Sequence, residues 1–171
     1  MPRFGAALSL SLLVASTPLA ALAQPAPRPL LPVSEIQVTI GPRLEAKAHD
    51  YGQHDLDMLA QELKADVEQQ LRKKGRLGPG GVRLLLTIAD ATPDHPTMAQ
   101  LGNNPSLDYM HSVGRGSATI DGVEIRPDGA RRTVHFEYEQ EYLREAHAQG
   151  TWGDAENTFD WFAREYADGR R

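Results

Sequence analysis

Apolar and polar residues alternate along Glu35–Ile40, which predicts a strand with one buried face. A second strand is predicted over Val82–Ile88. This segment is almost continuously apolar, so we expect it in the middle of a sheet with both of its faces covered. Gly116–Ile125 and Arg132–Tyr142 flank the turn Pro127-Asp128-Gly129-Ala130 and predict an antiparallel hairpin, with Gly122 marking a bulge.

Two segments have the three- and four-residue apolar spacing of amphipathic helices. In Asp55–Lys74 the first residue is a suitable N-cap, three basic residues stand at the negative end of the dipole, and Gly75 ends the helix. In Thr151–Ala167 the spacing of Thr151 and Asp154 predicts a capping box, and Gly169 ends the helix.

The order of these elements predicts an α+β fold. We expect a mixed sheet of about four strands, built as β-α-β, then a β-hairpin, then a C-terminal helix, with both helices on one face. The stretch from Gly41 to His54 has no clear period and is predicted to be a loop. Ala89–Arg115 contains three prolines and is predicted to be a long irregular segment, of the kind that often carries function.

Residues 1–23 have the pattern of a secretory signal peptide. Arg3 is followed by an uncharged apolar run, and Ala21-Leu22-Ala23 is a suitable cleavage site. The strongly apolar part is shorter than the roughly 20 residues that span a bilayer, so we expect cleavage after Ala23 and export, to the periplasm where the host has two membranes. Residues 24–34 are rich in proline and predict a disordered linker, which leaves 35–168 as a single α+β domain.

The amino-acid composition excludes several classes of site and of binding partner. The 171 residues are enough for one domain and contain no cysteine, which excludes disulfides, thiolate metal sites and cysteine nucleophiles. The 18 basic and 23 acidic residues give a net charge of −5, which argues against binding to nucleic acid. No stretch after the leader is long and apolar enough to span a membrane, and we expect no cofactor.

Catalytic motifs are missing from the predicted domain, since it has no GxSxG elbow, P-loop, GxGxxG turn or HExxH helix. The leading hypothesis is therefore a non-enzymatic, exported envelope accessory or binding protein. The alternative is a metal-binding protein or metal-dependent hydrolase that uses the patch around 49–57, where His49, His54 and Asp55 are the candidate ligands. The other interpretation of this patch is a polar loop that ends in a helix cap.

The long segment Ala89–Arg115 supplies the candidate partner-binding residues, which are Asp94, His95, Leu101 and Tyr109. Asp94, His95 and His111 form a second, weaker candidate for a metal site. The expected partner is an envelope protein. The oligomeric state stays open, because an unpaired edge on the first strand would also allow self-assembly.

Glu137, Glu139 and Glu141 project from one side of the second hairpin strand. Such a row could hold calcium or a basic partner. A solvated outer face is the simpler interpretation, because charges of this kind discourage edge-to-edge pairing of strands.

The second half of the sequence resembles a group of proteobacterial periplasmic and envelope proteins that contain a domain of unknown function. The resemblance covers about residues 35–168 and implies a small α+β unit in the cell envelope. Many lipoprotein relatives in that group carry an anchoring cysteine, which this chain lacks, so lipid anchoring is not implied. The group brings no activity and no catalytic residues. The motifs that carry the resemblance are Thr92-Pro93, His95-Pro96-Thr97, Gln100-Leu101, Gly114-Arg115-Gly116-Ser117-Ala118-Thr119-Ile120, Pro127-Asp128-Gly129, Thr151-Trp152-Gly153-Asp154-Ala155, Phe159 and Phe162-Ala163.

Overall fold

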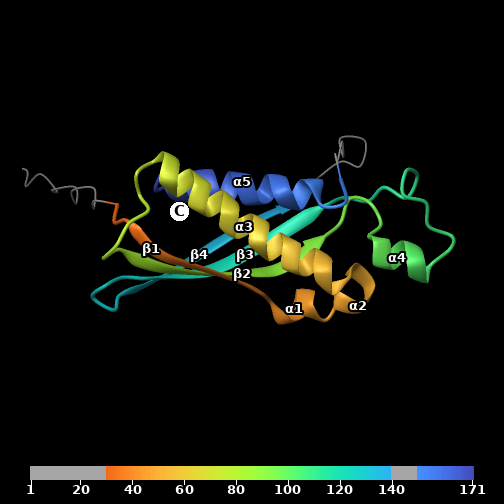
Figure 1. Cartoon of the computed structure of the whole chain (residues 1–171), viewed down its shortest axis with the longest axis horizontal. Helices are drawn as coiled ribbons and strands as arrows, with labels where there is room; N and C mark the ends of the chain where they lie inside the picture. The colour runs from red at the N-terminus through yellow and green to blue at the C-terminus, as the bar shows by residue number, and fades with distance from the viewer. Residues whose placement is uncertain (1–29, 140–149) are drawn as a thin grey trace, which may run out of the picture.

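A computed structural model describes residues 30–139 and 150–171 of the chain and arranges them as a four-stranded sheet with two long helices on one face (Figure 1). The predicted leader, most of the predicted linker, and the end of the predicted hairpin strand at Glu141 and Tyr142 lie outside the described residues. Within the described part of the chain, no helix is long and apolar enough to cross a membrane.

The strands are β1 (Val33–Ile40), β2 (Val82–Thr92), β3 (Ser117–Ile125) and β4 (Arg131–Glu139), and they lie in this order across the sheet. β1 pairs with β2 in parallel, whereas β2 with β3 and β3 with β4 are antiparallel. The prediction of a mixed four-stranded α+β sheet is therefore confirmed. β1 and β4 form its two edges, and β1 begins two residues before the predicted strand.

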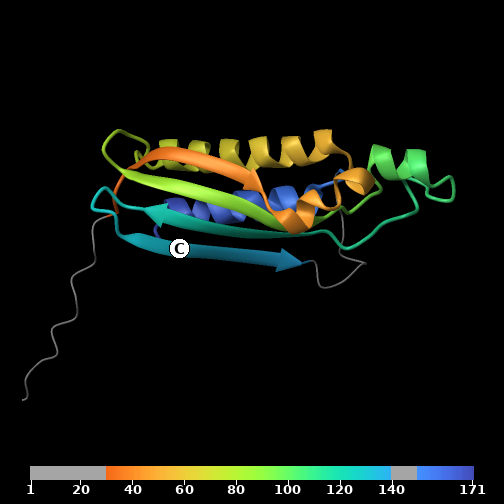
Figure 2. The same cartoon turned by 90° about the horizontal axis from the view of Figure 1, so that it is seen from below.

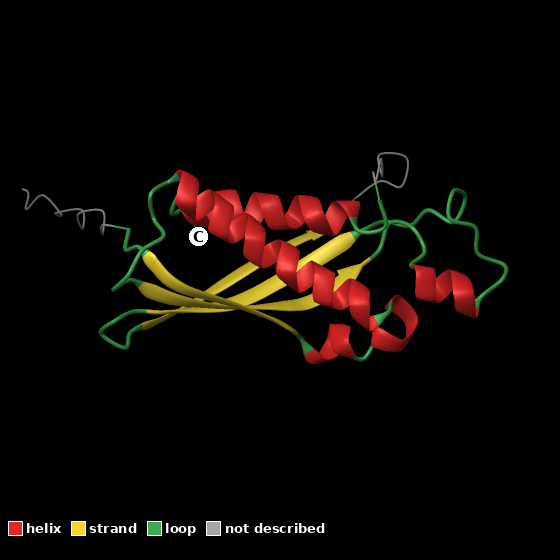
Figure 3. Cartoon of the chain, viewed as in Figure 1, coloured by secondary structure: helices red, strands yellow, loops and turns green. Residues whose placement is uncertain are grey.

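The long helices are α3 (Gln53–Lys73) and α5 (Gly153–Ala167), which pack against each other and against the same face of the sheet (Figure 3). Leu63 on α3 and Phe159 on α5 have no exposed surface, as their apolar spacing predicts. Gly75 adopts a φ of +64° just after α3, and the Arg76 N–H donates to the Leu71 carbonyl, which is the expected C-terminal stop.

The stretch before α3 is not the predicted loop. It contains two single-turn helices, α1 (Pro42–Glu45) and α2 (Ala48–Tyr51). Four residues are too few to show an apolar period, which is why the pattern missed them. Gly52, with a φ of +94°, separates α2 from α3 and is the N-cap residue of α3, so the prediction of Asp55 as the N-cap is wrong.

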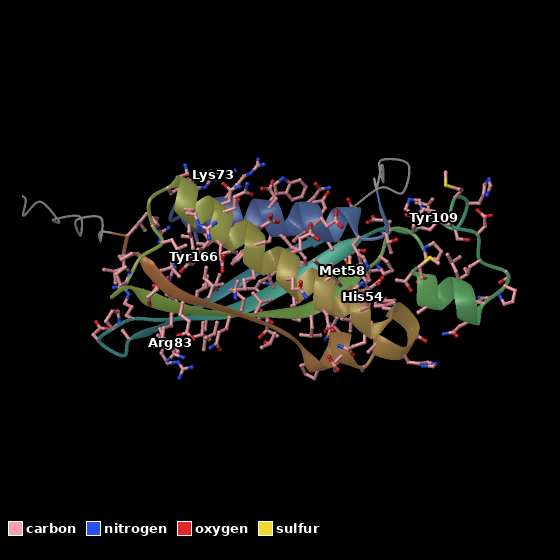
Figure 4. All side chains as sticks on the ribbon, viewed as in Figure 1. His54, Met58, Lys73, Arg83, Tyr109 and Tyr166 are labelled. Atoms are coloured by element: carbon pink, nitrogen blue, oxygen red, sulfur yellow. The ribbon has the colours of Figure 1, made fainter. Side chains whose placement is uncertain are left out.

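The covering of β2 also differs from the prediction, because both long helices lie on one face. Leu85 and Thr87 point to the other face and are half-buried, and Arg83 on that face is exposed (Figure 4). The apolar run in β2 therefore does not indicate a strand covered on both faces. The bulge predicted at Gly122 is not found there. The register between β2 and β3 shifts between Ile88 and Asp90 instead.

Candidate functional site

The segment Pro93–Arg115, called the lobe below, extends beyond one end of the sheet (Figures 1 and 2). It is not wholly irregular, because it contains α4 (Met98–Asn103). Thr97 and Gln100 form a capping box at the start of α4, with each side chain bonded to the other residue's backbone N–H. The Thr97 hydroxyl also donates to the Asp50 carbonyl, 3.2 Å away, which ties α4 to α2.

Asp94 joins the lobe to the rest of the fold. Its backbone N–H donates to the Thr151 carbonyl at 2.8 Å, and its carbonyl accepts from the Gly114 N–H at 2.7 Å. Its Oδ2 accepts from the backbone N–H of Asp154 at 2.9 Å. Both ends of the lobe and the start of α5 are thus connected through one residue, which has no exposed surface.

The start of α5 differs from the predicted capping box. Trp152 is the N-cap residue and makes no capping bond with its side chain, so Thr151 and Asp154 do not form the box. The carboxylate of Asp94, 60 residues earlier in the chain, accepts from the first turn instead. A tertiary cap of this kind satisfies a helix-terminal N–H without any local signature that a sequence pattern could detect.

Asp94 and Asp154 are both buried, and their carboxyl groups lie close enough for one to donate a hydrogen bond to the other when it is protonated. Burial and this bond to Asp154 raise the pKa of Asp94 to about 7, against the opposing effect of the backbone N–H groups of Asp154 and Gly116. Asp94 Oδ1 and Asp154 Oδ2 have no hydrogen-bond donor among the described residues. Because its pKa is raised, the Asp94 carboxyl holds a proton below about pH 7, and this proton can be donated to the Asp154 carboxylate.

Gly116 is required by this arrangement. A Cβ atom at this position would overlap Asp94 Oδ1 and would lie 2.6 Å from Asp154 Cβ, closer than real side chains approach. The carboxyl pair can therefore form only because the backbone of residue 116 carries no side chain.

A pocket of about 220 Å³ opens beside Asp94, between the lobe and α2. His95 lines this pocket and stacks on Tyr109, which lies outside the lining. The two ring centroids are 4.9 Å apart, and His95 Nδ1 lies 2.8 Å from the Tyr109 carbonyl oxygen. Figure 4 shows Tyr109 at this end of the molecule. The lining residues are Tyr51, Thr92, Pro93, Asp94, His95, Pro96, Gln100, Leu107, Ser112 and Gly114.

Among the candidate partner-binding residues, Asp94 and His95 line the pocket, and Tyr109 stacks on His95 without lining it. Leu101 lies on α4, half-buried and apart from the pocket lining. His111 is paired with Asp108, whose Oδ1 is 2.7 Å from His111 Nδ1, and not with Asp94 or His95.

The candidate metal ligands are separated. His49 on α2 and His54 on α3 are exposed, and Asp55 Oδ2 accepts a hydrogen bond from Trp152 Nε1 at 3.1 Å. Within residues 30–139 and 150–171, no group of three or more His, Cys, Asp or Glu side chains is placed to hold a metal ion. The metal-dependent alternative therefore gains no support from the described residues.

The acidic row on β4 is exposed, as a solvated outer face would be. Glu137 lies 3.8 Å from His135 Nε2, and Glu139 lies 3.5 Å from Arg115 Nη2. Glu141, the third member of the row, is outside the described residues.

The outer surface of the lobe carries apolar side chains in water. Met98 is 79% exposed and Met110 is 71% exposed, and Tyr109, which precedes Met110 in the chain, is partly exposed. Large apolar side chains at these exposures gain nothing from the fold of the isolated chain. They stand on the same protruding segment, which makes the lobe a candidate interaction surface.

No protein-family model matches the sequence, and no curated protein matches it. Among solved structures, a minor lipoprotein from Acinetobacter baumannii is similar at a TM-score of 0.30 and 12% sequence identity, over 78% of this chain and 94% of that chain. A likeness at this level carries no inference about function.

Proposed function

We propose that the protein is a non-enzymatic binding protein of the cell envelope that contacts another envelope protein through the lobe. The observation that carries this proposal is the pair Met98 and Met110, which are the most exposed large apolar side chains among the described residues and stand on the same segment. Burial of such side chains against a partner would be favourable by about 25 cal/mol for each Å² of apolar surface removed from water.

The base of the lobe supports this function because it is held in place. Asp94 is bonded to Thr151, Asp154 and Gly114, and Thr97 ties α4 to α2. A segment that is ordered before it meets its partner loses less conformational entropy on binding. The lobe therefore combines exposed apolar side chains with a base that hydrogen bonds hold against the rest of the fold.

A binding role suits the buried carboxyl pair better than a catalytic one. Asp94 is placed beside the pocket, but it has no exposed surface, and its carboxylate is engaged by Asp154 and the backbone of α5. A general acid must reach the proton acceptor of its substrate directly or through one water. We therefore assign Asp94 the role of positioning the lobe.

Export supports the choice of an envelope partner. The pattern of residues 1–23 predicts a leader that is removed during secretion, and the resemblance described above is to envelope proteins. The partner is expected to present an apolar groove or patch of its own, complementary to Met98 and Met110.

Site-specific photocrosslinking in intact host cells tests this function. A benzoylphenylalanine in place of Met98 or Met110 should give the same covalent adduct with one envelope protein. The matched control is Met58 on α3, which is 45% exposed but lies outside the lobe, and it should give no such adduct. The absence of an adduct from both lobe positions, or an identical adduct from Met58, would contradict the proposal.

A further inference from the structure

A second pocket has a volume of about 240 Å³. The elements that bound it lie at the other end of the sheet from the lobe (Figure 1). It is bounded by the β3–β4 hairpin, the C-terminal end of α5 and the start of the described chain at Leu30 and Leu31. Four arginines line it, and Glu124 is the one acidic residue in its lining: the arginines are Arg76, Arg126, Arg132 and Arg171.

Glu124 holds two of these arginines in place. Its Oε2 accepts from Arg132 Nη2 at 2.7 Å and from the Tyr166 hydroxyl at 3.0 Å, and its Oε1 lies 3.6 Å from Arg126 Nε. Burial alone would raise the pKa of Glu124, but Arg132 and Tyr166 hold that pKa below its usual range. The carboxylate is therefore charged, and it neutralises one of the guanidinium groups around it.

The other two arginines are anchored by different groups. Arg76 Nη1 donates to the carbonyls of Tyr166 and Ala167, at 2.7 and 2.8 Å, where α5 ends, and its buried Nε has no hydrogen-bond partner among the described residues. Arg171 Nε donates to Glu165 at 2.6 Å, and its guanidinium lies 4.9 Å from the centre of the Phe136 ring.

These contacts leave an excess of positive charge at the pocket. Among the side chains described above, four guanidinium groups face two carboxylates, Glu124 and Glu165, so these six side chains together carry a formal charge of 4 − 2 = +2. Each guanidinium has five N–H donors, more than the contacts above use. This excess stands out in a chain whose net charge is −5.

We propose that this pocket binds a phosphomonoester group. Such a group carries nearly two negative charges at neutral pH and several strong acceptor oxygens, which match the excess charge and the spare N–H donors of the pocket. Leu30 and Leu31 form an apolar wall beside the arginines, so the ligand can carry an apolar part next to its phosphate. The site is separate from the lobe and does not depend on its function.

Calorimetry of the purified protein with glycerol 3-phosphate at low ionic strength tests the proposal, with glycerol as the uncharged control. Arg126→Gln should weaken binding roughly tenfold or more, because it removes one charge-assisted contact. The matched control is Arg131→Gln on the same hairpin, which removes an equal charge. Alternation along β4 places Arg131 on the opposite face from Arg132, so this change should weaken binding by less than about twofold.

A second arm distinguishes a soluble ligand from a lipid headgroup. Vesicles of phosphatidylcholine with phosphatidic acid are compared with vesicles of phosphatidylcholine alone in a sedimentation assay. Binding to glycerol 3-phosphate alone supports a soluble phosphomonoester, and additional binding to phosphatidic acid that Arg126→Gln abolishes supports a lipid headgroup. No binding in either arm, or equal weakening by Arg126→Gln and Arg131→Gln, would overturn the proposal.

Discussion

Replacement of Gly116 by alanine should lower the free energy of unfolding by about 3 kcal/mol, because the added methyl group must displace a buried and hydrogen-bonded carboxyl pair. The new Cβ would overlap Asp94 Oδ1 and would stand 2.6 Å from Asp154 Cβ. Relief requires Asp94 to move, which breaks its bond to the first turn of α5. Urea denaturation followed by far-UV circular dichroism measures the loss.

Gly114→Ala is the matched control. A Cβ atom on residue 114 would lie 3.4 Å from the Pro93 carbonyl oxygen, which is an ordinary contact distance. Residue 114 is nevertheless only two positions before Gly116 in the sequence. Loss of glycine flexibility in the unfolded state should offset any small strain, so we expect a change within about 1 kcal/mol. Equal destabilisation by the two substitutions would mean that the Asp94–Asp154 pair is not the reason for glycine at position 116.

The stability of the protein should fall as the pH rises from 5 to 8. The folded-state pKa of Asp94 is about 7, against an ordinary value of 3.8, so between these values the native state holds a proton that the unfolded state releases. The stability that this proton contributes is fully present below about pH 4, is lost between about pH 4 and pH 7, and does not change further at higher pH. Its size is on the order of a few kcal/mol.

Asp94→Asn should remove most of this pH dependence. The amide oxygen can still accept from the Asp154 N–H, and the amide N–H₂ can donate to the Asp154 carboxylate as the protonated acid does. We expect the variant to match the wild type near pH 5 and to be more stable at pH 8. Asp57→Asn, an exposed carboxyl on α3, is the control and should leave the slope unchanged. A wild type whose stability is flat or rises over this pH range would contradict the raised pKa of Asp94.

Much of the fold follows from the sequence, because its long elements have strong periods. The apolar stripe that contains Leu63 and Phe159 predicts α3 and α5, and the alternation around Ile36 and Val134 predicts strands that the structure contains. α1 and α2 escape prediction because one helical turn shows no period. The apolar run in β2 overstates its burial, because Leu85 on the open face is only half-buried.

The site is harder to predict because its contacts join distant segments. Asp94 and Asp154 are 60 residues apart, and a local pattern assigns Asp154 to a capping box with Thr151 that the structure does not form. Asp94, His95 and Tyr109 could be singled out only as polar and aromatic residues in a long segment. The signal that was present is Gly116, since a glycine entering a strand often marks a close approach of another group.

Oxidation of methionine by hydrogen peroxide tests most directly whether the lobe is covered by a partner. Met98, Met110 and Met58 are all exposed in the isolated chain, so in purified protein all three should oxidise readily. In intact cells, peptide mass spectrometry should find that Met98 and Met110 oxidise several-fold more slowly relative to Met58. If the rates of Met98 and Met110 relative to Met58 are the same in cells as in the purified protein, the lobe is not a binding surface.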